Sequence, residues 1–225
     1  MPHPSRRSLL SLLAGSLAAA CVPFEKRSPF WGTIAAGFKG TPGPVITRAY
    51  TDQLPYASMV AWFKGSPKSL LVLSDIGADQ RLTWYSAERQ SLTTYGPFVV
   101  AATGLEIELH GTEFAGAWHS NPLDLVGQEL ERVLDIRVEG KRTQVPLRSR
   151  FELGEMAAVD ILGTRHQLQR VVENVSFKGR HRHDNEYWVE PQTGRTWKSR
   201  QIAIPTLPPL NTEVAKYPAA KKGAA

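Results

Sequence analysis

EYWVEPQTGRTWKSRQI, residues 186–202, is the clearest local structural signal in this chain of 225 residues. The segment PQTG at 191–194 has proline and glycine at the positions that a β-turn favours. Aromatic-rich segments lie on both sides of it, so the stretch predicts a β-hairpin. In that hairpin, Trp188 and Trp197 are expected to pair across the two strands.

Similar short strand-like runs extend through most of the chain. ASMVAWF at 57–63 and SLLVLS at 69–74 flank a break that contains glycine and proline, which predicts another hairpin. Further runs lie at 81–87, 91–95, 98–102, 105–110, 144–153 and 158–177, the last broken near Gly163. Strands with turn signals about every 8–12 residues are typical of antiparallel sheets. We therefore predict an all-β fold, an antiparallel meander folded into two barrel- or sandwich-like halves.

The segment NPLDLVGQELERVLDIR at 121–137 differs from this pattern. Asn121 is a candidate helix cap, Pro122 occupies the first helical position, and apolar residues follow with helical spacing. The segment predicts a short helix or an irregular crossover between β-halves at 57–110 and 144–202.

The N-terminal segment MPHPSRRSLLSLLAGSLAAA has the layout of a secretory signal. Arg6 and Arg7 form a basic start, and the apolar run that follows is shorter than the roughly 20 residues of a membrane-spanning helix. Both the general secretion route and the twin-arginine route fit this segment. Small residues precede Cys21, the only cysteine, which therefore has no internal disulfide partner. This arrangement resembles a lipobox, where bacterial lipoproteins are acylated on cysteine and cleaved before it, and it predicts lipidation of Cys21.

These patterns divide the chain into four parts. We expect a signal peptide at 1–20 and a lipidated N-terminus with a Pro/Gly-rich tether at 21–47. An all-β domain follows at 48–210, and a basic, disordered tail ends the chain at 211–225. The formal net charge is +6, but the basic residues are scattered, so no nucleic-acid partner is predicted.

The sequence offers no catalytic constellation. It contains neither a nucleophile elbow nor a P-loop nor a dinucleotide-binding glycine motif, so we predict no catalytic residues and no cofactor. Asp75 and Asp79 in SDIGADQ have the residue type of a glycosidase pair, and a glycan-active hydrolase is one alternative function. Aspartate and glycine are also typical of hairpin loops, and we prefer that interpretation.

A histidine-rich segment, GRHRHDNE at 179–186, raises the question of a metal. His181, His183 and Asp184 are weak candidate ligands, because imidazole and carboxylate groups suit zinc. Arg180 and Arg182 alternate with the histidines and would repel a cation. We therefore predict no metal site, and a His-rich metal-binding lipoprotein is the second alternative function.

Aromatic side chains are the residues best suited to stacking on sugar rings. We take Trp84, Tyr85, Trp188 and Trp197 as candidate glycan contacts, and core packing is the competing interpretation for each.

Three stretches carry a family resemblance together with the lipobox at Cys21. They are LPYASMVAWFKGSPKSLLVLS at 54–74, RLTWYSAERQSLTTYGPFVVAATGL at 81–105 and NEYWVEPQTGRTWKSRQIAIPTLPPL at 185–210. They resemble the YjbF/GfcB family of bacterial exopolysaccharide and group 4 capsule lipoproteins. The resemblance implies an all-β lipoprotein with no known catalytic residues, lipid-anchored in the outer membrane and facing the periplasm. It also implies a non-catalytic role in polysaccharide assembly or export, with polysaccharide or export proteins as partners.

Overall fold

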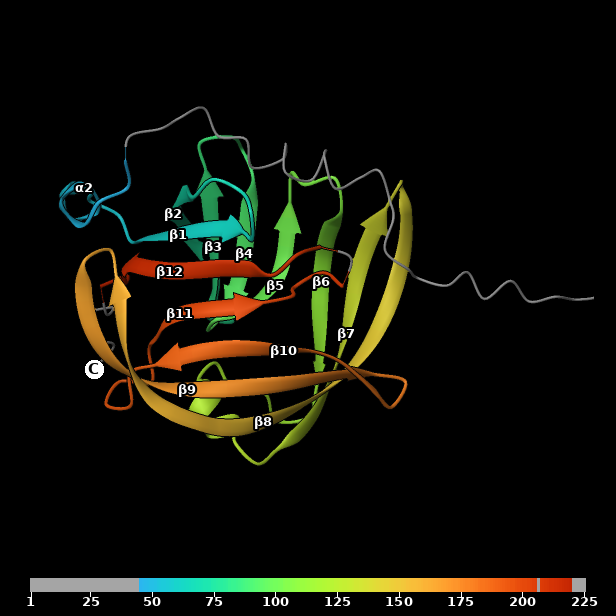
Figure 1. Cartoon of the computed structure of the whole chain (residues 1–225). Coiled ribbons are helices and arrows are strands. Elements are labelled where there is room, and N and C mark those ends of the chain that lie inside the picture. The colour runs from blue at the N-terminus through green and yellow to red at the C-terminus, as the bar shows by residue number, and fades with distance from the viewer. Residues whose placement is uncertain (1–44, 206, 220–225) are drawn as a thin grey trace, which may run out of the picture.

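The computed structural model of the chain describes residues 45–205 and 207–219. Its twelve antiparallel strands form one closed barrel, in which each strand pairs with the next along the chain and β12 pairs with β1 (Figure 1). The predicted all-β meander is confirmed. The strands are β1 (Ser58–Phe63), β2 (Ser69–Ile76), β3 (Arg81–Ser86), β4 (Ser91–Tyr95), β5 (Phe98–Thr103), β6 (Glu108–Ala115), β7 (Glu129–Val138), β8 (Lys141–Ile161), β9 (Thr164–Phe177), β10 (Arg180–Val189), β11 (Thr196–Gln201) and β12 (Leu210–Lys216).

Two-residue turns join the long strands β7 to β10. Glu139-Gly140, Leu162-Gly163 and Lys178-Gly179 each have positive φ at both residues. Such turns match the twist of the strands that they connect, and glycine takes the second position without steric cost. The predicted break near Gly163 is therefore confirmed as the β8–β9 turn.

The hairpin of residues 186–202 is confirmed as β10 and β11, but its predicted tryptophan pair is wrong. Trp188 lies opposite Lys198, and Val189 lies opposite Thr196, so Trp197 is the additional residue of a β-bulge. A bulge places two residues of one strand opposite one residue of its partner and reorients the side chain. The hairpin of β1 and β2 is also confirmed, with Ala61 opposite Ser69.

The predicted crossover at 121–137 begins as a helix and continues as a strand. The 3-10 helix η1 (Pro122–Leu125) is capped by Asn121, whose Oδ1 accepts a hydrogen bond from the Leu123 backbone N–H at 3.1 Å. Gly127 then adopts a φ of +81°, and β7 follows with alternating burial. The apolar residues at 130, 133 and 134 of β7 also fit a helical spacing, which is why this part of the sequence resembled a helix.

The end of the barrel differs from the predicted domain boundaries. β12 lies between β1 and β11 and closes the barrel, so the expectation of disorder throughout 211–225 is wrong for residues 211–216. The predicted signal peptide, Cys21 and the predicted tether up to residue 44 lie outside the described residues.

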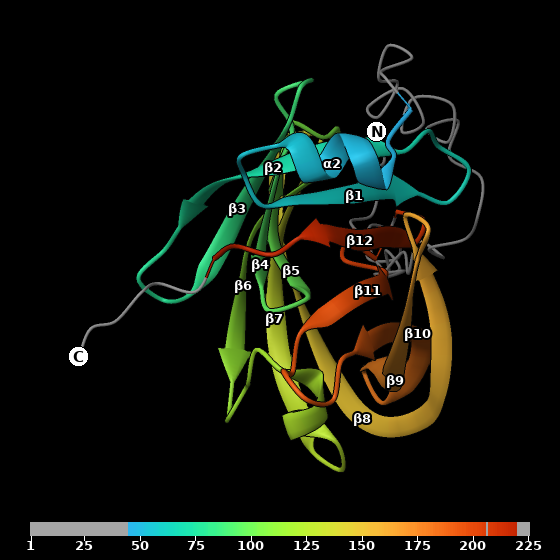
Figure 2. The same ribbon diagram turned by 90° about the vertical axis from the view of Figure 1, so that its left-hand side faces the viewer.

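A short helix that the sequence did not predict, α2 (Arg48–Gln53), precedes β1. The Arg48 guanidinium donates to the backbone oxygens of Ala215 at 2.6 Å and Ile161 at 3.0 Å. These bonds fix α2 beside β12 and the β8–β9 turn, as Figure 2 shows.

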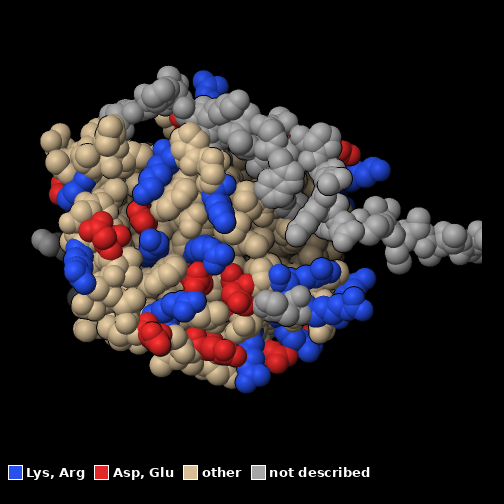
Figure 3. Space-filling view, in the orientation of Figure 1, with Lys and Arg blue, Asp and Glu red and all other residues tan. Residues whose placement is uncertain are grey.

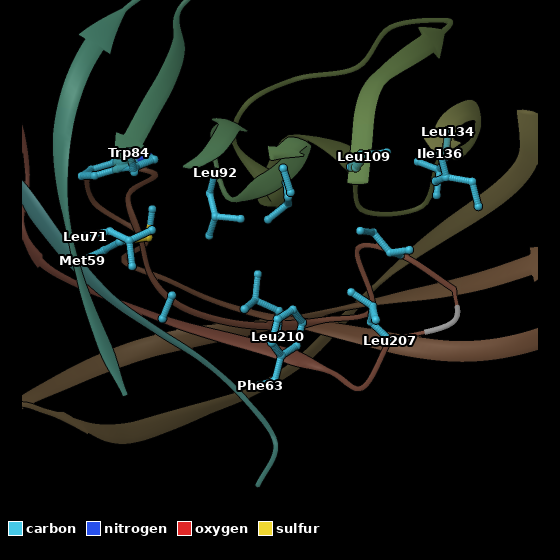
Figure 4. Close-up of a cluster of buried hydrophobic side chains, with 14 of the residues drawn as sticks. Met59, Phe63, Leu71, Trp84, Leu92, Leu109, Leu134, Ile136, Leu207 and Leu210 are labelled. Atoms are coloured by element: carbon cyan, nitrogen blue, oxygen red, sulfur yellow. The ribbon is translucent and has the colours of Figure 1, made fainter. Parts of the chain in front are cut away.

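Buried side chains form two clusters. The first gathers residues from both ends of the chain, including Met59, Leu71, Trp84, Leu134 and Leu210, and Figure 4 shows them facing one another from opposite walls. The second cluster contains Phe98, Val100, Trp118, Leu125, Leu130, Phe151, Val171, Tyr187 and Val189. The two clusters do not match the predicted halves at 57–110 and 144–202, because each cluster draws residues from both ranges and all twelve strands form one closed barrel.

Candidate functional site

A buried ion pair lies inside the barrel. Arg132 on β7 and Glu173 on β9 occupy inward positions of half-buried strands, and their Nη1 and Oε1 atoms are 2.7 Å apart. The Glu173 side chain is 0% exposed and the Arg132 side chain 8%. The Arg132 guanidinium also lies over the Trp118 ring, at 5.4 Å from its centroid. A carboxylate at such a position requires compensation for its lost hydration.

Three further side chains supply that compensation to Glu173. Ser149 donates to Oε1 at 2.5 Å, while Asn185 and Tyr187 donate to Oε2 at 2.9 and 2.6 Å. Burial alone raises the pKa of the Glu173 carboxyl, but the Arg132 charge and these hydrogen bonds outweigh it and hold the pKa below its usual value. Burial and the nearby Glu173 charge raise the pKa of the Tyr187 hydroxyl well above its usual value.

The space beside this network is small. A cavity of ≈10 Å³ is lined by Arg132 together with Phe98, Thr112, Leu134 and Gln201, among others. That volume is about enough for one water molecule and too small for a sugar. The geometry therefore assigns the Arg132–Glu173 network to stabilising the barrel, not to binding a polymer.

The outer face of β10, β11, β12 and β1 carries a different arrangement. A row of side chains crosses these strands and includes one residue of the β1–β2 connection. We call it the charged ladder: Trp62, Lys68 just before β2, Glu213, Lys198 and Trp188. The Glu213 carboxylate forms ion pairs with Nζ of Lys68 at 3.5 Å and with Nζ of Lys198 at 3.3 Å. Lys68 lies over the Trp62 ring at 4.2 Å, and Lys198 lies over the Trp188 ring at 5.6 Å.

A second set of charges adjoins the ladder. Glu186 on β10 forms ion pairs with Arg170 and with Arg200, the latter at 2.8 Å. Figure 3 shows positive and negative side chains side by side on the face that Figure 1 presents. Half-buried tryptophan rings flanked by hydrogen-bonding charges are the groups from which glycan-binding faces are built. We take the charged ladder as the candidate functional face of the described barrel.

A shallow groove lies elsewhere on the outer surface. It has a volume of ≈400 Å³ and is lined by Ala115, Gly116, Glu129, Leu130, Glu131 and Arg148. Arg148 pairs with Glu129 at 3.2 Å and with Glu131 at 2.7 Å, so each charged side chain of the groove already has a partner within it.

The four predicted glycan contacts have different surroundings. Trp84 is a core residue, because it is 3% exposed and its indole N–H donates to Thr94 at 3.2 Å, so this candidate was wrong. Tyr85 on β3 is 45% exposed, and β2 separates its strand from β1 of the ladder. Only Trp188 belongs to the charged ladder.

Trp197 contributes to a separate aromatic cluster. Its ring lies 4.5 Å from that of His166 and 5.2 Å from that of Tyr217, whose hydroxyl donates to the Thr196 carbonyl at 2.6 Å. Burial raises the pKa of Tyr217 well above its usual value. This cluster links β9 and β11 to the segment after β12.

The weak metal candidates lie at the start of β10. A register shift between His181 and His183 interrupts the regular pairing of β10 with β9. His183 pairs with Val175 and Asp184 with Asn174, and neighbouring strand positions alternate between faces. Among the described residues, no group of three or more His, Cys, Asp or Glu side chains is arranged to hold a metal ion.

Of the carboxylate pair considered as an alternative, Asp79 lies in the β2–β3 turn, as the loop interpretation predicted, whereas Asp75 belongs to β2 and lies opposite Thr83. Asp75 and Asp79 are both exposed, and Asp79 forms an ion pair with Arg81 at 2.9 Å. Their position gives no enclosed space between the two carboxyl groups.

Sequence reasoning missed the residues of the buried network and most of the ladder. A charged residue inside an apolar alternation was the available signal for Arg132 in ELERVLDIR and for Glu173 in VVENV. No comparable signal marked Lys68 and Glu213, which lie 145 residues apart in sequence.

No helix within the described ranges is both long and apolar enough to cross a membrane.

Comparisons with known proteins agree with this fold. The family YjbF, described as group 4 capsule polysaccharide lipoprotein GfcB, matches residues 31–214. The crystal structure of the hypothetical lipoprotein YmcC from Escherichia coli (K12) is similar, with a TM-score of 0.69 and 20% sequence identity, over 87% of this chain and 100% of that chain. No curated protein matches the chain. Because the family match covers the whole barrel except the end of β12, the chain belongs to the YjbF family of group 4 capsule polysaccharide lipoproteins.

Proposed function

We propose that this chain is an outer-membrane lipoprotein, facing the periplasm, that assists the assembly or export of capsular polysaccharide or exopolysaccharide without catalysing a reaction. The observation that carries the proposal is the family match, since it extends over almost the entire barrel. The lipobox at Cys21 supports the membrane anchor. In enteric lipoproteins an aspartate directly after the lipidated cysteine retains the protein in the inner membrane, and Val22 occupies that position here, which supports the outer membrane.

The charged ladder supports a binding role. Trp62 and Trp188 lie three strands apart, which corresponds to roughly 14 Å across a sheet. An extended polymer is long enough to contact both rings and the charges between them. A protein of the export machinery would bind the same face.

A deletion strain tests the process. Loss of this protein should reduce the polysaccharide at the cell surface, measured by staining and by sugar analysis of washed cells, and the wild-type gene should restore it. Normal surface polysaccharide in the deletion strain would contradict the proposed function.

The anchor has its own test. The variant Cys21→Ala lacks the thiol that carries the lipid, so it should leave the outer-membrane fraction on a density gradient. Ser28→Ala, in the expected tether, is the matched control and should not alter the membrane fraction in which the protein is found. If the Cys21→Ala protein still fractionates with the outer membrane, the lipid anchor is refuted.

A further inference from the structure

The turn between β9 and β10 concentrates positive charge. We call Lys178, Arg180 and Arg182 the basic tip; all three are exposed. The ten residues of 174–183 contain no aspartate or glutamate. Lys178 occupies the first position of the two-residue turn, and Arg182 falls at the register shift of β10, so turn and bulge present these cations at the end of the hairpin.

Two of these cations converge on one aromatic ring. Lys178 Nζ lies 5.3 Å from the centroid of Phe177, and the Arg182 guanidinium carbon lies 5.4 Å from it. Attraction to the ring holds both charges near the same place. Their mutual repulsion is unfavourable until an anion binds between or beside them.

The basic tip also lacks the acidic partners of other surface arginines. Arg142, Arg148 and Arg200 each pair with a carboxylate on a neighbouring strand. Within 45–205 and 207–219, no ion pair includes a residue of the basic tip. Its charge is therefore available to a ligand.

The charge of the remaining barrel directs an anion to the same place. Seven of the 27 Lys and Arg residues and one of the 21 Asp and Glu residues lie outside 45–219, which leaves 20 of each within it. Without the three cations of the basic tip, that range has 17 basic and 20 acidic residues, a net charge of −3. A polyanion would be repelled by the barrel as a whole and attracted at this hairpin.

The basic tip lies far from the point where the N-terminal segment enters the barrel. Arg48 of α2 contacts Ile161 at the β8–β9 turn, whereas the basic tip follows the opposite end of β9. Fourteen residues of β9 separate the two, about 40 Å along a strand, and Figure 1 shows them on opposite sides of the molecule. The basic tip therefore lies away from the side where α2 joins the barrel.

We propose that the basic tip binds a polysaccharide that carries carboxylate groups, an inference that rests on the proposed role in polysaccharide assembly or export. Arginine guanidinium groups match carboxylates with paired hydrogen bonds, and lysine adds a point charge.

Binding of the purified full-length protein to immobilised polygalacturonate tests the inference, with neutral dextran as the control glycan. The variant Lys178→Asn, Arg180→Gln, Arg182→Gln removes the three charges, and asparagine suits the positive φ of position 178. We expect its affinity for polygalacturonate to fall about tenfold or more, because charge-assisted hydrogen bonds to carboxylates are lost. The matched control, Arg137→Gln, Arg142→Gln, Arg148→Gln, loses the same net charge from paired sites. Its affinity should stay within about twofold, since exposed ion pairs contribute little.

Several results would overturn the inference. Equal loss of affinity in both triple variants would show a general charge effect, and equal binding of dextran would show that carboxylates are irrelevant. Binding of phosphatidylglycerol vesicles through the basic tip, without binding of polygalacturonate, would assign it to a membrane. If the deletion strain has a polysaccharide defect but the tip variant binds polygalacturonate normally, only this inference fails. If the deletion strain has no defect, the proposed function fails whatever the tip binds.

Discussion

Glu173 shows how strongly the barrel depends on a single buried charge. Its carboxylate receives four donors, from Arg132, Ser149, Asn185 and Tyr187. These donors come from β7, β8 and β10, and Glu173 itself lies on β9, so its carboxylate links four consecutive strands. Its contribution is cooperative, because removing the charge leaves several buried donors without their acceptor.

Glu173→Gln should therefore destabilise the fold strongly. The substitution leaves the buried Arg132 charge without a counter-ion, and breaking a buried pair in this way costs about 3–5 kcal/mol. Urea unfolding followed by tryptophan fluorescence measures the change in the free energy of unfolding. Glu131→Gln is the matched control, since Glu131 pairs with Arg148 at the surface, and it should change stability by about 1 kcal/mol or less. Equal effects of both variants would contradict a special role for the buried pair.

The Glu173 carboxyl should also make the stability of the fold depend on pH. The pKa of Glu173 is lower in the folded protein than its usual value, so the folded state favours the charged form. Its contribution to stability is complete above the unfolded-state pKa of about 4.3 and is lost as the pH falls through the folded-state pKa. We expect the wild-type protein to lose more stability than Glu173→Gln between about pH 5 and pH 2. Parallel loss of stability in the two proteins would contradict this assignment.

Individual side chains were the least predictable part of the candidate site. Trp84, Trp188 and Trp197 all follow strand-like patterns, yet one is buried, one joins the charged ladder and one lies in a bulge. A single additional residue in β11 reverses the direction of a side chain, and no local composition marks where such a residue is inserted. The residue types were informative, but their surroundings depend on strands distant in sequence.

At the scale of elements, turns were easier to predict than the segments between them. Gly163 and the PQTG segment marked hairpins, because positive φ and fixed φ are properties of glycine and proline themselves. β7 was harder, since apolar residues at 130, 134 and 136 satisfy strand alternation while 130, 133 and 134 also satisfy a helical spacing. Pairing with β6 and β8 decides between the two.

Gly96 in the β4–β5 turn is a sharp test of such an element. Its φ is +55°, and a Cβ at this position would lie 1.9 Å from the Ser120 carbonyl oxygen. Gly96→Ala combines left-handed strain with a backbone clash, so we expect a loss of about 3 kcal/mol or more, or failure to fold. Thermal unfolding by circular dichroism gives the measurement.

Gly111→Ala provides the control for this change. Gly111 lies in β6 without positive φ, and nothing lies within 4 Å of an added Cβ. Its stability should change by about 1 kcal/mol or less. If Gly96→Ala were as stable as Gly111→Ala, the turn could shift away from Ser120, and the close approach of the two segments would not restrict residue 96 to glycine.

The whole molecule depends on contacts between distant parts of the chain. The first cluster of buried residues joins Met59 and Leu71 from early strands to Leu207 and Leu210 near the end. The sequence predicted an antiparallel meander, because each hairpin is local. It did not predict closure, since the β1–β12 pairing joins segments about 150 residues apart, and Pro205, Pro208 and Pro209 made the last segment resemble a tail.

Truncation of the C-terminus distinguishes a tail from a closing strand. A chain that ends at Pro209 lacks β12, which leaves β1 and β11 with unpaired edges and removes Leu210 and Ala215 from the core. We expect this chain to lose its cooperative urea transition and to aggregate, because an exposed strand edge pairs with other molecules. A chain that ends at Ala219 retains β12 and the Tyr217 hydrogen bond to Thr196, so its transition midpoint should match that of the full chain. If the shorter chain unfolded with the same midpoint, β12 would be dispensable and the barrel would stand without closure. Loss of the transition only in the shorter chain would show that the last strand completes the fold.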